Sequence, residues 1–196
     1  MGDALTDVER AAAALASGGV VVIPTDTVYG LAARADDAAA IDRIYALKAR
    51  SRDKELQLLI PDVGWLDRLS RPSAAARRLA ERFWPGPLTI ILSGLQEESR
   101  VGLRVPAHAV ALDLLGRVGA VAATSANRSG EPTPADVAAI RDLFGNAVDV
   151  YLDGGTIAGA ASTVVDLTGA EPEIVREGNI SAADIAHALE GRFEGH

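Results

Sequence analysis

The chain has 196 residues, 48% of them hydrophobic, which is enough to bury one substantial core, and we expect a single domain over residues 1–196. The absence of cysteine excludes a disulfide framework and a thiolate metal site, and no apolar run reaches the roughly 20 residues of a membrane helix. A net charge of −8 argues against a basic surface that binds nucleic acid. We therefore expect a cytoplasmic protein that makes no contact with a membrane.

The first buried strand and the helix behind it organise the predicted fold. The strand, Val20–Ile23, consists of four β-branched residues and is stopped by a proline, a pattern typical of strands covered on both faces. A polar turn, Pro24–Thr27, follows, and an amphipathic helix over about residues 37–47 leads to Lys48 and Arg50. This order places hydroxyl groups at the C-terminal edge of the strand, where open α/β sheets bind ligands.

The rest of the chain continues as short apolar strands separated by helices and turns. Strands are predicted at residues 56–60, 88–92, 101–106, 119–127, 148–152, 162–167 and 174–176. Helices are predicted from Thr6 to before Gly18 and at residues 65–69, 73–83, 110–116, 136–144 and 181–189. This alternation predicts an α/β protein, without an internal repeat or a second core.

The polar residues at the ends of the predicted strands and helices can be considered as one set of candidate site residues. They are Thr25, Thr27, Lys48, Arg50, Lys54, Arg104, Ser125, Asn127, Ser162 and Arg176. The set is rich in cations and hydroxyl groups and contains no histidine, which fits a polyanionic substrate such as a nucleotide. The phosphate-binding motif GxxxxGK[ST] and the dinucleotide motif GxGxxG are both missing, so side-chain cations would have to hold the phosphates of ATP.

Seven sequence blocks resemble those of one known family and occur in its order. They are PTDTVYGL, KAR, FWPGPLTIIL, GLRVP, TSANRSG, DGG with STVVDL, and IVREG. They cover about residues 18–178, most of the chain. The series resembles the YrdC/Sua5 family, and the length of the chain resembles that of its short stand-alone YrdC-like (TsaC) type.

This resemblance implies a fold, a reaction and a partner. The implied fold is an α/β domain with a twisted mixed sheet of parallel and antiparallel strands, surrounding helices and a large open cavity. The implied reaction joins L-threonine, bicarbonate and ATP into threonylcarbamoyl-AMP and pyrophosphate, the first step towards the tRNA nucleoside t6A. The implied functional partner is a TsaD-type transferase with its accessory proteins, and contact with tRNA is expected to be indirect or weak.

The resemblance also assigns residues. The family's K-x-R and S-x-N tetrad falls on four residues expected to be catalytic, Lys48, Arg50, Ser125 and Asn127. The residues expected to bind ATP are Lys48, Arg50, Lys54, Ser125, Asn127 and Arg176. Mg²⁺ is expected to be carried on the phosphates, because no cluster of acidic residues at ligand spacing offers it a protein site.

The expected threonine-binding residues are Thr27, Arg104 and Ser162. Arg104 suits the carboxylate of threonine because its planar guanidinium can bind both oxygens, while the two hydroxyl groups suit the amine and the hydroxyl of the amino acid. The chain departs from the family's usual KxRP at Ser51, which replaces the proline and predicts a looser link up to Glu55.

Two other classes of function stay open. One is a YciO-like paralogue with the same fold and another substrate, against which the retained K-x-R and S-x-N motifs argue. The other is an RNA-binding module, which the net charge of −8 and the lack of a basic patch with interleaved aromatic residues make the weaker hypothesis.

Overall fold

The structure is a computed structural model that describes residues 6–190. Its α-helices are α1 (Asp7–Ala16), α2 (Ala38–Lys48), α3 (Leu66–Leu69), α4 (Ala74–Phe83), α5 (Ala109–Val118), α6 (Val137–Phe144) and α7 (Ala182–Glu190). Its strands are β1 (Val21–Ile23), β2 (Gly30–Arg34), β3 (Gln57–Leu59), β4 (Leu88–Ser93), β5 (Arg100–Arg104), β6 (Val121–Ser125), β7 (Val150–Tyr151), β8 (Thr163–Asp166) and β9 (Glu173–Arg176). Two 3-10 helices are η1 (Val63–Trp65) and η2 (Gly145–Ala147).

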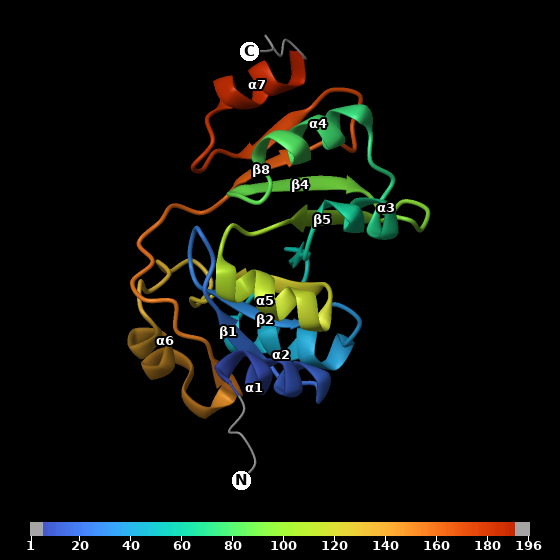
Figure 1. Cartoon of the computed structure of the whole chain (residues 1–196). Helices are drawn as coiled ribbons and strands as arrows, with labels where there is room; N and C mark the ends of the chain where they lie inside the picture. Colours follow the sequence, from blue (N-terminus) through green and yellow to red (C-terminus); the bar gives the residue numbers. More distant parts are fainter. Residues whose placement is uncertain (1–5, 191–196) are drawn as a thin grey trace.

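The strands of the described region form one mixed sheet in the order β7-β1-β2-β6-β3-β5-β4-β8-β9. The pairs β1–β7, β3–β5 and β4–β8 are parallel, and the pairs β1–β2, β2–β6, β3–β6, β4–β5 and β8–β9 are antiparallel. This arrangement confirms the predicted α/β fold with a mixed sheet. Helices α1, α2 and α5 lie around β1 and β2, whereas α4 and α7 lie beside β4 and β8 (Figure 1).

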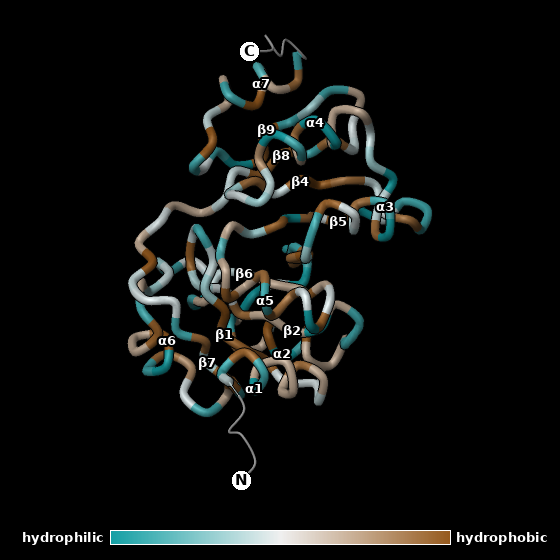
Figure 2. Tube along the Cα trace, viewed as in Figure 1, coloured by the Kyte–Doolittle hydropathy of each residue, from teal (hydrophilic) through white to brown (hydrophobic). Residues whose placement is uncertain are grey.

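Around β1 the sheet is covered on both faces. Val20 and Val22 pack with residues of α2 and α6, whereas Val21 and Ile23 pack with residues of α1 and α5. Continuous β-branched character therefore corresponds to a strand without a solvent face, as predicted. Figure 2 shows β1 and β4 as largely hydrophobic segments of the chain.

Strand β2 was not predicted from the sequence. Its sequence, GLAAR, offers one glycine and two alanines, which have low strand propensity, and no alternation of polar and apolar residues. The strand forms because it pairs with β1 on one side and β6 on the other. Tertiary pairing, which local sequence does not encode, therefore decides this element.

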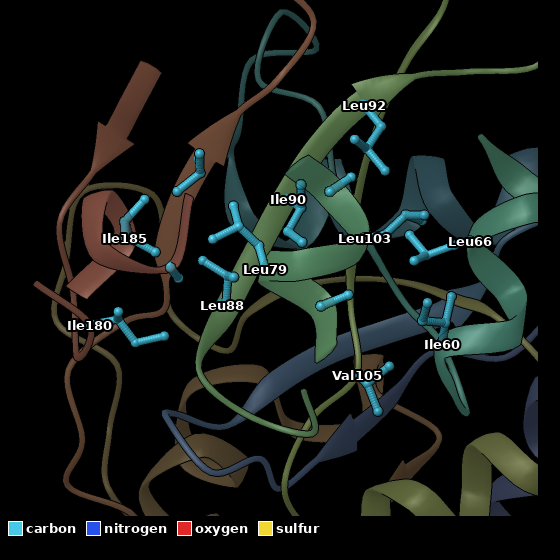
Figure 3. Packing of buried hydrophobic residues seen from close by; sticks show 14 residues of the cluster. Ile60, Leu66, Leu79, Leu88, Ile90, Leu92, Leu103, Val105, Ile180 and Ile185 are labelled. Atoms are coloured by element: carbon cyan, nitrogen blue, oxygen red, sulfur yellow. The ribbon is translucent and has the colours of Figure 1, made fainter. Parts of the chain in front are cut away.

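Around β4 the helices cover one face of the sheet. Leu88 and Ile90 pack with Leu79 of α4 and Ile185 of α7 in a cluster of buried side chains (Figure 3). The alternate residue Thr89 points to the opposite face, as the period of two in a strand requires. That second face lines a cavity, so this half of the sheet provides the floor of the candidate site.

Side chains that cap the first turn mark the starts of the helices. Thr6 and Glu9 form a capping box at the start of α1, and Ser73 accepts a hydrogen bond from the backbone N–H of Ala76 in α4. Asp37 caps α2 in the same way, and this helix ends at Lys48, one residue later than predicted. Among the helices of residues 6–190, none has the length and apolar character that crossing a membrane requires.

Candidate functional site

A cavity of about 320 Å³ lies over the open face of the sheet. Strands β3, β5, β4 and β8 provide its floor, and β6, β9 and the link after α2 provide its sides. The residues that line it are Arg50, Glu55, Leu56, Gln57, Thr89, Ile91, Arg100, Gly102, Ala123, Thr124, Ser125, Val164, Val175 and Arg176. Gly102 adds no side chain to the floor, where a Cβ would lie in ordinary van der Waals contact with Cγ2 of Thr89, at 3.5 Å.

Lys48 lies under the rim of the cavity and holds the end of β6. Its side chain is 1% exposed, and Nζ donates to the carbonyl oxygen of Ser125 at 2.5 Å and to the carbonyl and side-chain oxygens of Asn127 at 2.7 and 3.0 Å. An ammonium has three hydrogens, so these acceptors occupy all of them. Burial and the positive charge of Arg50 lower the pKa of Lys48 to about 8. The protonated Lys48 therefore holds the Ser125–Asn127 segment in place through three hydrogen bonds.

Ser125 and Asn127 are joined to one another. The Ser125 hydroxyl donates to Oδ1 of Asn127 at 2.5 Å, and Nδ2 of Asn127 donates to the carbonyl oxygens of Arg128 and Glu131. Ser125 lines the cavity, whereas Asn127 is 8% exposed and lies behind it. The four residues of the predicted tetrad are thus brought together, with Ser125 and Arg50 at the surface of the cavity.

Arg50 organises the link between α2 and β3. Its Nε donates to the carbonyl oxygen of Lys54 at 3.0 Å and Nη2 donates to that of Glu55 at 3.3 Å. The hydroxyl of Tyr45 also donates to the carbonyl oxygen of Lys54, at 3.1 Å. The link after Ser51 is therefore held through its carbonyl groups, and Nη1 of Arg50 makes no hydrogen bond within the described residues.

Arg176 faces the cavity from β9. Its Nε and Nη2 donate to the carbonyl oxygen of Ser162 at 3.0 and 2.9 Å, and Nη2 also donates to the Ser162 hydroxyl at 3.1 Å. Burial and then the charge of Arg50 lower the pKa of Arg176, so the two guanidinium groups are electrostatic neighbours. Neither of them forms an ion pair with a carboxylate among residues 6–190. The site therefore has an excess of positive charge that suits a polyanion.

Arg104 lies below the Thr-rich turn after β1 and is 2% exposed. Its Nε donates to the carbonyl oxygen of Gly86 at 3.0 Å, Nη1 to the Thr27 hydroxyl at 2.9 Å and Nη2 to Oδ1 of Asp26 at 2.6 Å. Burial lowers the pKa of Arg104 and the neighbouring Asp26 carboxylate opposes that shift. The carboxylate of threonine was the expected partner of Arg104, and in the structure the carboxylate that pairs with it is that of Asp26.

The glycine-rich loop after β7 closes over the same turn. A Cβ at Gly159 would lie 2.3 Å from the carbonyl oxygen of Thr27, so the two backbones meet at a distance that a larger residue would prevent. Thr27 accordingly is 1% exposed. The predicted threonine-binding residues Thr27, Arg104 and Ser162 are all buried in the wall of the site and do not line the cavity itself.

The structure also shows residues that sequence reasoning did not place in the site. Gln57, Arg100 and Gly102 line the cavity, whereas the predicted ligand Lys54 does not. Arg100 forms an ion pair with the largely buried Asp166. A lone amide within the apolar run LQLLI was the available signal for Gln57, because a polar side chain on a central strand has to face a polar space.

Fold and site together define an α/β protein with an arginine-rich cavity built for an anionic ligand. The family model Sua5/YciO/YrdC, described as telomere recombination, matches residues 13–178, and the chain belongs to this family. A relative from Mycobacterium leprae, named putative threonylcarbamoyl-AMP synthase, is 42% identical over 193 residues, which are 93% of this chain and 87% of that protein.

Two solved structures that differ in their sequence identity to this chain share its fold. Sua5 of Pyrococcus abyssi in complex with L-threonine superimposes with a TM-score of 0.88 and 34% identity, over 95% of this chain and 58% of that protein. The chain thus spans less than two thirds of the archaeal protein. YciO of Escherichia coli has a TM-score of 0.85 and 28% identity, over 93% of this chain and 95% of that protein.

Proposed function

We propose that this chain is a threonylcarbamoyl-AMP synthase, which uses L-threonine, bicarbonate and ATP. The observation that carries the proposal is the neighbouring pair Arg50 and Arg176, which lines the cavity and forms no ion pair with a carboxylate within residues 6–190, in a chain of net charge −8. Relatives with this enzyme name, and a structural neighbour that binds L-threonine, support the choice of substrates.

The chemistry needs cations more than a proton-transfer base. The amine of threonine forms a bond to the carbon of bicarbonate and water leaves, which gives a carbamate. One carbamate oxygen then bonds to the α-phosphorus of ATP as the bond from that phosphorus to pyrophosphate breaks. Negative charge is dense in this transition state, so preorganised guanidinium groups and hydroxyl donors stabilise it.

Each residue of the site has a role in this scheme. Arg50 and Arg176 bind phosphate oxygens, and Ser125 lines the phosphate path while its hydroxyl donates to Oδ1 of Asn127. Lys48 and Asn127 hold that segment in place. Arg104 is buried and does not line the cavity, and in this proposal it binds the carboxylate of threonine through the hydrogens that its terminal nitrogens leave unused. Mg²⁺ enters as part of the ATP substrate, and within residues 6–190 no group of three or more His, Cys, Asp or Glu side chains gathers as a metal site.

The direct test is mass detection of threonylcarbamoyl-AMP. Purified protein with ATP, Mg²⁺, L-threonine and ¹³C-bicarbonate should release pyrophosphate and form an adduct that carries one ¹³C. Omission of either threonine or bicarbonate should stop pyrophosphate release. Pyrophosphate release that is independent of threonine would instead indicate the YciO-like alternative.

A second part of the proposal concerns the fate of the product. Threonylcarbamoyl-AMP is a mixed anhydride and hydrolyses readily, so we propose that a TsaD-type transferase with its accessory proteins consumes it to form t6A on tRNA. Reconstituted modification of tRNA should require that transferase. Modification by this protein alone would contradict this scheme.

The titration of Lys48 predicts how activity depends on pH. Its pKa is lowered from 10.5 to about 8, so the folded protein loses this proton as the pH rises through about 8. The neutral amine has two hydrogens for three oxygen acceptors, so the Ser125–Asn127 segment loses one of its hydrogen bonds. We expect kcat/KM for ATP to fall as the pH rises through about 8, and kcat to fall at higher pH because bound phosphates favour the ammonium.

The same titration can be observed directly, because the chain has two lysines, Lys48 and Lys54. With ¹⁵N-labelled lysine, the Nζ signal that disappears in a Lys48→Met variant identifies Lys48. Its midpoint should lie near 8 in the free protein. A midpoint near 10.5 would show that the three acceptors offset the effect of burial, and the predicted fall in kcat/KM should then be absent as well.

A further inference from the structure

A chain of side-chain hydrogen bonds crosses the floor of the cavity from β9 to β3. Nη2 of Arg176 donates to the Ser162 hydroxyl at 3.1 Å, the hydroxyl groups of Ser162 and Thr89 are 2.9 Å apart, and the Thr89 hydroxyl donates to Oε1 of Gln57 at 2.6 Å. Ser162 and Thr89 are 2% and 3% exposed. These hydroxyl groups therefore depend on one another for their partners.

The direction of this chain follows from counting hydrogens. The buried Ser162 hydroxyl accepts from Arg176, and its own hydrogen has Thr89 as its side-chain acceptor within the described residues. Thr89 must therefore accept from Ser162 and direct its single hydrogen to Gln57. With the amide of Gln57 reversed, the two hydroxyl groups would have one acceptor too few, and the hydrogen of either Thr89 or Ser162 would be buried without a partner, which is unfavourable. The network thus fixes the carbonyl oxygen of the Gln57 amide towards Thr89.

The amide nitrogen of Gln57 is consequently turned away from Thr89. Gln57 lines the cavity, and no hydrogen bond from Nε2 to protein exists within residues 6–190. Two N–H donors are available here on the floor, next to Gly102, which has no side chain to cover them. A donor held in this way is suited to an oxygen acceptor on a ligand.

The position of β3 in the sheet indicates which oxygen that is. β3 lies between β6, which ends in Ser125, and β5, which ends in Arg104. In the proposed function, Ser125 belongs to the phosphate side and Arg104 to the amino-acid side. The group that connects these two sides in the product is the carboxyl carbon that comes from bicarbonate, so this group has to pass over β3.

We propose that Gln57 is a further substrate-binding residue, whose amide N–H donates to the carbamate oxygen that does not attack phosphorus, and that Thr89 is the residue that positions it. The inference rests on the proposed function and adds the recognition of the bicarbonate-derived group. The donor stabilises negative charge on the carbamate as it forms and holds the other oxygen in line with the α-phosphorus. A glutamine amide does this without a proton transfer.

Kinetics with bicarbonate as the varied substrate test the proposal. Gln57→Glu still accepts from Thr89 but replaces the N–H donors by an anionic oxygen, so KM for bicarbonate should rise at least tenfold while KM for ATP and for threonine change less than threefold. Gln57→Leu should act in the same direction. An unchanged KM for bicarbonate in both variants, or a parallel rise in all three KM values, overturns the proposal.

Thr89 variants separate positioning from a general structural role. Thr89→Val removes the hydroxyl at nearly constant volume and should raise KM for bicarbonate, whereas Thr89→Ser keeps the hydroxyl and should behave like the parent protein. Adding Thr89→Val to Gln57→Leu should cause little further change, because both substitutions break one chain. Additive effects, or a loss in Thr89→Ser equal to that in Thr89→Val, contradict the positioning role.

NMR of the glutamine side chains tests the role of Gln57 independently of the kinetics. The chain has two glutamines, Gln57 and the exposed Gln96, so ¹⁵N-glutamine labelling yields two side-chain amide signals, one of them an internal control. Threonylcarbamoyl-AMP formed in the sample should shift the Gln57 amide and leave Gln96 unchanged. If the parent protein forms the adduct and neither signal moves, the inference fails while the proposed function stands; if no adduct forms, the proposed function itself fails.

Discussion

Arg50→Lys should lower kcat/KM for ATP by roughly a hundredfold, although it conserves the charge, which corresponds to about 2.7 kcal/mol of transition-state stabilisation. In the proposed function Arg50 performs two tasks with one planar group: Nε and Nη2 donate to the carbonyl oxygens of Lys54 and Glu55, and Nη1, which makes no hydrogen bond within residues 6–190, binds phosphate. The side chain of lysine has one nitrogen. It can hold the link or bind a phosphate oxygen, but it cannot bind two oxygens in a fixed plane.

Arg52 supplies a matched control in the same link. It is exposed, forms an ion pair with Asp42 at 2.7 Å and lies over the ring of Tyr45 at 5.6 Å from its centroid. Arg52→Lys should leave kcat/KM for ATP within about twofold of the parent value, because an exposed ion pair contributes little. Equal losses in the two variants would show that the link as a whole is sensitive, and near-parental turnover in Arg50→Lys would remove Arg50 from the phosphate site.

Local sequence predicted those parts of the fold in which a single pattern dominates. Val20–Ile23 was identifiable as a doubly covered strand because four β-branched residues in succession have few other solutions. The strand that contains Thr89 was also recognised, and its successive residues alternate between the core cluster of Leu88, Ile90 and Leu92 and the cavity face of Thr89 and Ile91. The strand Gly30–Arg34 was missed because pairing on both edges, and not propensity, stabilises it.

The residues of the candidate site were predictable, but the hydrogen bonds and the ion pair that connect them were not. End-of-strand position and the family resemblance brought Arg50, Ser125 and Arg176 together, and all three line the cavity. The sequence could not show that the Lys48 ammonium donates all three of its hydrogens to the end of β6, because the acceptors lie 77 and 79 positions away in the chain. Nor could it show that Asp26, 78 positions from Arg104, is the partner of that arginine.

The ion pair between Asp26 and Arg104 leads to the largest expected effect on stability. Asp26 accepts from Nη2 of Arg104 and from the backbone N–H of Ala107, and its side chain is 15% exposed. Arg104→Ala would leave this carboxylate without its cation in a nearly buried position. Breaking a buried pair from one side costs about 3 to 5 kcal/mol, so we expect a loss of that size in the free energy of unfolding, measured by urea denaturation.

The same substitution should change threonine binding for a separate reason. Arg104 uses three of its five N–H groups on Gly86, Thr27 and Asp26, which leaves one hydrogen on each terminal nitrogen for a substrate carboxylate. We expect Arg104→Ala to raise KM for threonine far more than KM for ATP. A rise in both by the same factor would mean that Arg104 has a structural role alone.

The double variant Asp26→Ala/Arg104→Ala separates these two effects. Removing Asp26 as well eliminates the unpaired carboxylate, so the free energy of unfolding should recover part of its loss relative to Arg104→Ala. KM for threonine should stay high, because in the proposed function the missing guanidinium is the group that binds the substrate carboxylate. If KM for threonine recovers together with stability, the buried charge of Asp26, and not the loss of a carboxylate ligand, accounts for the defect of Arg104→Ala.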